Sequence, residues 1–276
     1  MERVRRVIKK TLKYVSKPEM RVLPGQLAFF FVLSLIPLVA LVGTLASYFS
    51  ISTGTITDLL DSILPFDIND SMLSFVAGKG MTFNIAIFFL SGFILASNGT
   101  HSMIITSNEI YKVKDENIVR RRLKAIWMTI ILVLLLLFLL LVPVYGMTIF
   151  DALTQGLESD AVNNARAIYK VLQYPISLGL VYYNIKLLYT IAPDRKIKPK
   201  TTTTGAIFTT VGWIIATELY SIYAGTFANY NLFYGSISDI LILLVWVYIL
   251  SYIFVLGMSI NATNAEIDDY ETMQLT

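Results

Sequence analysis

The side chains that could do chemistry are few in this chain of 276 residues. It contains one histidine, His101, and no cysteine, so it offers neither a His-rich metal centre nor thiolate chemistry. The sequence also has no glycine-rich phosphate loop, nucleophile elbow or zincin motif. These residue types argue against an enzyme, and they predict no cofactor and no metal site.

One carboxylate, Glu218, interrupts the apolar segment 205–225 near its far end. An ionisable group at depth in a membrane is costly, so such a residue is by default a functional candidate. Lys170 and Asp239 lie at similar predicted depths in neighbouring segments. Glu218 could therefore form a structural ion pair with Lys170 or serve as a proton or cation site. Asp239 is a second candidate for a substrate path.

Amide and hydroxyl side chains recur every seven residues in segment 81–101, at Asn84, Ser91 and Asn98. This spacing places them on one helical face with a small angular drift. A polar face of this kind is directed at protein or water. It predicts either hydrogen bonds between helices, worth about 0.6–2 kcal/mol each, or part of a substrate path.

Two prolines lie inside apolar segments, Pro37 within 27–49 and Pro175 within 168–192. Each removes a backbone hydrogen bond and predicts a helix kink. They fall in the leading helix of each half of the chain. Paired helix breaks in two inverted halves are typical of transporters, whose binding region lies near the midplane.

The elements that must position these residues are long apolar helices. Of all residues 55% are hydrophobic and 15% charged, and the mean hydropathy is +0.65, which indicates a membrane protein rather than a soluble domain. Stretches of about 20–25 residues cross a hydrocarbon core of about 30 Å. We predict an all-α, polytopic membrane protein with a bundle of about six transmembrane helices, near 27–49, 81–101, 125–147, 168–192, 205–225 and 237–261. Lys170, Asn184 and Lys186 interrupt the fourth, so five spans is the alternative.

The basic residues are placed unevenly. Of 22 Lys and Arg, eight precede the first span, six lie between the second and third, and four lie between the fourth and fifth. By the positive-inside rule these loops and both termini are cytoplasmic. Orientation thus explains the basic loops, and no nucleic-acid partner is predicted.

The two ends of the chain differ in charge. We divide it into a basic cytoplasmic segment 1–22, a six-helix transmembrane domain 23–262 and an acidic cytoplasmic tail 263–276. Apolar residues in 3–17 share one helical face, which predicts an amphipathic helix on the membrane surface that could meet anionic lipids. Two further short amphipathic helices are predicted in the first outer loop, one over Thr55–Leu64 and a second in a short stretch after Asp70.

Small residues line one face of the fifth span, at Gly205, Thr209, Gly212 and Ala216. This pattern predicts that a neighbouring helix approaches closely.

Several ordered motifs resemble the YihY/virulence factor BrkB family of bacterial inner-membrane proteins. They are LAFFFVLSLIPLVAL from Leu27, NEIYKV from Asn108, LLYTIAPDRKIKP from Leu187 and GAIFTTVGW from Gly205. The longest stretch, from Tyr223 to Ala262, contains the family's turn motif at Tyr230, Asn231, Tyr234 and Gly235, followed by a closing Gly-x-x-x-Asn.

The resemblance implies six helices in the bacterial cytoplasmic membrane. It implies a transporter or flippase-like role for a polar or lipid-linked envelope substrate, or else a non-transporting scaffold in envelope assembly. The family once carried a ribonuclease label, which the missing metal cluster here does not support. Relatives commonly have Glu two residues after the last-helix Gly, whereas Gly257 is followed by Met258 and Ser259. The oligomeric state is not predicted.

Overall fold

The structure is a computed structural model. It describes residues 22–33, 85–113, 117–154, 160–226 and 238–273, together with the single positions Lys9, Thr11, Lys13, Ser16 and Met20. Helices and turns account for these residues, and the described part of the chain contains no strand. The predicted all-α class is confirmed. The two stretches predicted as outer-loop helices and the turn motif from Tyr230 to Gly235 lie outside the described residues.

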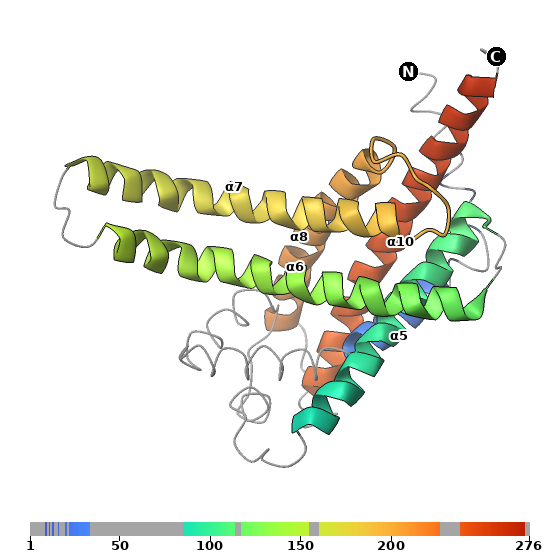
Figure 1. The fold of residues 1–276 in the computed structure, drawn as a ribbon, viewed down its shortest axis with the longest axis horizontal. Coiled ribbons are helices and arrows are strands. Elements are labelled where there is room, and N and C mark those ends of the chain that lie inside the picture. The colour runs from blue at the N-terminus through green and yellow to red at the C-terminus, as the bar shows by residue number, and fades with distance from the viewer. Residues whose placement is uncertain are drawn as a thin grey trace.

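Five long helices carry the architecture (Figure 1). They are α5 (Ile85–Tyr111), α6 (Ile118–Leu153), α7 (Asp160–Ile191), α8 (Thr203–Thr226) and α10 (Ser238–Met273). A shorter apolar helix covers Val22–Leu33, the beginning of the first predicted span. Each of the last five predicted spans overlaps one of the five long helices, and every helix is longer than its span.

Specific residues set the helix ends. Asn117 is the N-cap of α6, because its Oδ1 accepts hydrogen bonds from the backbone N–H groups of Val119 at 2.9 Å and Arg120 at 3.2 Å. At the end of α5, Lys112 adopts a left-handed backbone with φ 55°. The N–H of Val113 donates to the carbonyl of Asn108 at 2.9 Å, which completes a Schellman cap.

Two described helices contain apolar stretches long enough to cross a membrane, Thr203–Ala224 in α8 and Leu241–Asp269 in α10. The number of spans stays a prediction, although α6 and α7, at 36 and 32 residues, also exceed the length that a bilayer requires.

The outward face of α8 supports a membrane environment. It exposes large apolar side chains in a continuous row: Ile207, Phe208, Val211, Ile215, Leu219 and Ile222. In water such a row would be an unfavourable patch, whereas in a bilayer it meets lipid.

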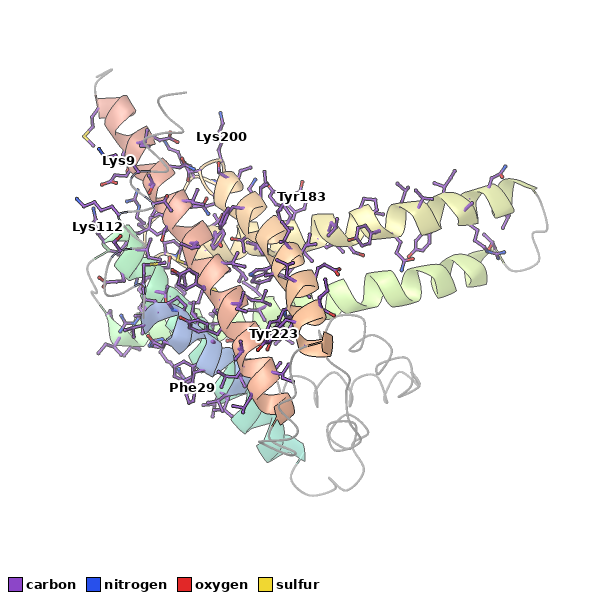
Figure 2. The ribbon with its side chains drawn as sticks, turned by 180° about the vertical axis from the view of Figure 1, so that it is seen from behind. Lys9, Phe29, Lys112, Tyr183, Lys200 and Tyr223 are labelled. Carbon is purple, nitrogen blue, oxygen red and sulfur yellow. The ribbon has the colours of Figure 1, made fainter. Side chains whose placement is uncertain are left out.

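The helices meet at one shared end of the bundle. Antiparallel α6 and α7 lie side by side and project beyond the other helices (Figure 1), while α8 packs along α10. At the shared end α5 stops and α6 starts, α7 stops and α8 starts, and α10 stops. We call this the basic end, because it carries Arg120, Arg121, Arg122, Lys196, Lys198 and Lys200. Lys9, Lys112 and Lys200 all lie towards this end of the molecule (Figure 2).

The core lies between α5, α7, α8 and α10, towards the basic end. Its fully buried side chains include Met103, Tyr189, Phe254 and Met258. α10 runs without a break past the predicted boundary at 262, and Ala265 and Ile267 are buried. The domain division stays a prediction, but the segment named a tail begins as packed helix.

Candidate functional site

The carboxylate predicted as functional, Glu218, is exposed on α8. Its helical neighbours Ile215, Leu219 and Ile222 are 53, 62 and 61% exposed. Residues three and four apart share a helix face, so Glu218 stands on a largely apolar outward surface, with Ser221 as its exposed polar neighbour. Lys170 lies in α7 outside the described side chains, and its pairing with Glu218 stays a prediction.

The predicted polar face of α5 is seen in part. Asn98 is half-buried, and its Oδ1 accepts a hydrogen bond from Arg122 Nη1 of α6 at 2.8 Å. Asn84 lies outside the described residues, and the side chains of Ser91 and Asp239 also lie outside the description. At Asn98, therefore, the polar atom is engaged in a bond between helices.

One of the two predicted kink positions falls in a described helix. Pro175 lies inside α7, which continues as a helix on both sides of it. Its ring is exposed. Pro37 lies outside the described residues, so the comparison between the two halves of the chain stays a prediction.

A polar cluster that sequence reasoning did not single out ties three helices together at the basic end. Asn108 of α5 donates from Nδ2 to Asp194 Oδ2 at 2.7 Å, and its Oδ1 accepts from the Asp194 backbone N–H at 2.9 Å. Lys124 of α6 donates to Asp194 Oδ1 at 2.6 Å. Asp194 follows α7, so one carboxylate joins the ends of α5, α6 and α7. We call Asn108, Lys124 and Asp194 the inner triad.

Lys124 also completes the end of α7. Its Nζ donates to the carbonyl oxygens of Ala192 and Pro193, both at 2.8 Å. A cation at a helix C-terminus is favourable because the last carbonyls lack partners and the helix dipole is negative there. The side chains of Lys124 and Asp194 are 25 and 30% exposed, so the pair is partly shielded from solvent.

The surroundings of Asp194 lower the pKa of its carboxyl group. Partial burial would raise its pKa, but hydrogen bonds from Lys124 and Asn108 and the charges of Lys124 and Arg120 outweigh this effect. The pKa of Asp194 therefore lies below its ordinary value, and the carboxylate is ionised at neutral pH.

Two further ion pairs join α10 to the loops of the basic end. Lys112 Nζ lies 3.4 Å from Glu266 Oε1, and Arg195 Nη2 lies 2.9 Å from Asp269 Oδ2. We call these two pairs the rim pairs. Their side chains are 62 and 33% exposed in the first pair and 37 and 48% in the second. Solvent screening leaves such pairs worth about 0–1 kcal/mol each.

Below the basic end, α8 and α10 touch through glycines. A Cβ added to Gly205 would collide with the carbonyl oxygen of Gly257 and with the Asn261 side chain. The Gly205 N–H donates to Asn261 Oδ1 at 2.8 Å. The predicted close approach of a helix to the small-residue face of α8 is confirmed.

A buried tyrosine of α7 bonds to α8 and α10 beside their glycine contact. The Tyr189 hydroxyl donates to the Phe254 carbonyl at 2.7 Å and lies 2.6 Å from Thr209 Oγ1. Its ring packs on Phe254 with centroids 4.6 Å apart. A Cβ at Gly257 would collide with Thr209 Oγ1, so α7, α8 and α10 fit together only because Gly257 has no side chain.

Among the described residues, no three His, Asp or Glu side chains gather where they could hold a metal ion. The cluster at the basic end is instead a set of ion pairs and amide bonds. That the chain is not an enzyme stays a prediction.

The residues of the inner triad were present in the sequence motifs. Asn108 begins NEIYKV, and Asp194 lies within LLYTIAPDRKIKP. The two residues are 86 positions apart in the chain, so spacing could not bring them together. The resemblance marked both stretches, but it gave no role to either side chain.

Long apolar helices, a lipid-type outward face and glycine-mediated helix contacts define an all-helical integral membrane protein. The family model for virulence factor BrkB matches residues 11–274. The chain therefore belongs to the virulence factor BrkB family, as its motifs indicated.

The chain is similar to proteins from several bacteria, two of which are named membrane proteins. A protein of Bacillus subtilis named ribonuclease-like protein YfkH is 32% identical over 249 residues, which cover 86% of this chain and 87% of the relative. A UPF0761 membrane protein of Vibrio parahaemolyticus is 25% identical and covers 92% of this chain and 81% of the relative. One from Pseudoalteromonas translucida is 24% identical, with 91 and 84% coverage. No solved structure matches the chain.

Proposed function

We propose that this protein is a transporter or flippase-like protein that handles a polar or lipid-linked envelope substrate. The observation that carries the proposal is the exposed carboxylate of Glu218 on the apolar face of α8. An ionisable group among lipid-facing side chains is costly, and a structural role would favour burying it with a partner. A carboxylate on such a face suits contact with the polar head of an amphipathic molecule whose tail stays in lipid.

The same proposal places the chain in the bacterial cytoplasmic membrane with both termini inside. The distribution of Lys and Arg supports this orientation. Lys9 and Lys13 are exposed, which supports contact between the N-terminal basic segment and anionic lipid headgroups.

Reconstituted vesicles test the role of Glu218. Fluorescent phosphatidylethanolamine and phosphatidylglycerol serve as probes, and their movement between leaflets is followed by chemical quenching from outside. Glu218→Gln should lower the rate by about tenfold or more, because the amide keeps the shape and removes the charge. Ser221→Ala, which alters an exposed polar neighbour on α8, is the matched control and should move lipid at the normal rate.

Equal rates of lipid movement for wild-type and Glu218→Gln protein would show that Glu218 has no part in the mechanism. If wild-type protein moves the lipids no faster than protein-free vesicles do, these lipids are not substrates, and the second candidate function is favoured.

That second function is a scaffold in envelope assembly without transport. It is favoured by the way described polar side chains are used in bonds between helices: Asn98 accepts from Arg122, and Thr100 Oγ1 lies 2.8 Å from Thr129 Oγ1. Such bonds stabilise a bundle and offer no path. A scaffold predicts that Glu218→Gln leaves envelope integrity in cells unchanged, as judged by sensitivity to detergent.

A further inference from the structure

The inner part of α10 fills the centre of the basic end. From Met258 to Ala265 its side chains are buried with the exception of Ile260, which is half-buried. Most of them are small or polar, and the run reads MSINATNA. We call residues 258–265 the inner segment of α10.

Few of its polar groups fix the inner segment to other helices. The hydroxyls of Ser259 and Thr263 donate to carbonyls of α10 itself, those of Val255 at 3.0 Å and Ser259 at 2.9 Å. Ser259 also lies 3.9 Å from Met20 Sδ, a long and weak contact. Asn261 does bond to Gly205, yet its Nδ2 is buried without a hydrogen-bond partner among the described residues. A buried donor of this kind is costly and would gain a partner from water.

The charges around the inner segment divide into two groups of unequal strength. The inner triad joins α5, α6 and α7 through bonds of 2.6–2.9 Å and does not include α10. The rim pairs hold α10, and they are longer or more exposed. Exposed pairs break readily, whereas the partly shielded triad resists opening. Among the charged links at this end, the rim pairs that hold α10 are therefore the weaker group.

From these contacts we propose that the inner segment of α10 is a plug that closes the basic end and moves aside when the rim pairs release. The glycine contact between Gly205 and Gly257 lies at the base of the plug, and there α10 stays in close contact with α8. The ends of α5, α6 and α7 stay together through the inner triad. The reason for opening rests on the proposed transport function, but the movement can be measured without it.

Two buried serines provide the test, since the chain has no cysteine of its own. Ser259 lies in the plug and Ser107 lies in α5, and both are 0% exposed. Ser259→Cys and Ser107→Cys are made singly, in the otherwise unchanged protein and in one that also carries Glu266→Gln and Asp269→Asn. The labelling rate with a membrane-impermeant maleimide is measured in nanodiscs.

Loss of the rim pairs should speed labelling at Ser259→Cys by about five- to tenfold, as expected from removing two exposed ion pairs. Labelling at Ser107→Cys should stay slow, because the inner triad is intact. An unchanged rate at Ser259→Cys would overturn the plug. An equal increase at both positions would also overturn it, because this result means that the whole end loosens.

A second experiment links the plug to transport. Lys112→Cys and Glu266→Cys are introduced together and joined by a short cleavable bis-maleimide. Lipid movement should stop when the pair is joined and return when the linker is cut. Movement at the normal rate with the linker in place would overturn the plug. No movement in the unlinked protein would count against the proposed function, while the serine labelling would still decide the plug.

Discussion

The central contact between α8 and α10 and the inner triad hold the bundle by opposite means. At Gly205 and Gly257 the helices touch because side chains are absent. At Asn108, Lys124 and Asp194 they are joined because charged and amide groups reach across. The stability of the glycine contact should fall when side-chain volume is added there and should not depend on pH or salt. The stability of the inner triad should tolerate small changes of shape and should depend on both pH and salt.

The largest expected effect comes from adding one methyl group to the central contact. Gly205→Ala places a Cβ against the backbone of α10, which cannot turn away as a side chain could. We expect a loss of stability of about 3 kcal/mol, measured as a lower midpoint of thermal unfolding in detergent, at any salt concentration. Gly179→Ala is the matched control: nothing lies within 4 Å of its Cβ, and helix propensity predicts a gain of up to about 1 kcal/mol. Similar losses for both would refute the close contact.

A smaller, pH-dependent effect is expected at the inner triad. Asp194→Asn should cost about 1–3 kcal/mol at pH 7. Because the folded state lowers the pKa of Asp194, its contribution is complete above the ordinary carboxyl pKa of about 4 and is lost as the pH falls through the folded value. The stability gap between wild type and variant should therefore close in acid and narrow in high salt. A gap that is equal at pH 7 and pH 3 would contradict this role.

The smallest expected effect is a gain in stability. Lys112 holds a left-handed backbone at the end of α5, a conformation that costs about 1 kcal/mol for a residue with a side chain. Lys112→Gly should raise stability by about 0.5 kcal/mol even though it removes one rim pair. Lys112→Ala loses the same pair and keeps the strain, so it should be no more stable than wild type in denaturant titrations. A stabilised alanine variant would mean that the backbone is not the cause.

The two regions also differ in how far the sequence alone could predict them. The small-residue face of α8 follows from helical periodicity, and Gly205 and Gly212 both meet a neighbouring helix as predicted, which the structure identifies as α10. Helix positions followed from apolar runs, but the ends did not, since caps such as Asn117 and Lys112 lie outside those runs. The inner triad was hidden because the positive-inside rule already explained Lys124, and nothing in the spacing connects Asn108 to Asp194.

Glu218 shows what else the sequence alone could not predict. Its presence inside an apolar segment marked it as unusual, but periodicity could not tell whether it faces a partner or the surroundings. The row from Ile215 to Ile222 places it outward. The sequence could identify the residue that breaks the pattern, and the structure was needed to assign its face.

Pro175 leaves one backbone carbonyl of α7 without its usual helical hydrogen bond. Proline has no N–H, so the Val171 carbonyl lacks its usual helical donor, and both residues are exposed. Bare hydrocarbon cannot hydrate that oxygen. The oxygen therefore needs water, a headgroup or a donor from another segment. A position at the headgroup level would leave only the part from Ile176 to Ile191, about 24 Å long, inside the hydrocarbon, and the bilayer would then have to thin locally beside the protein.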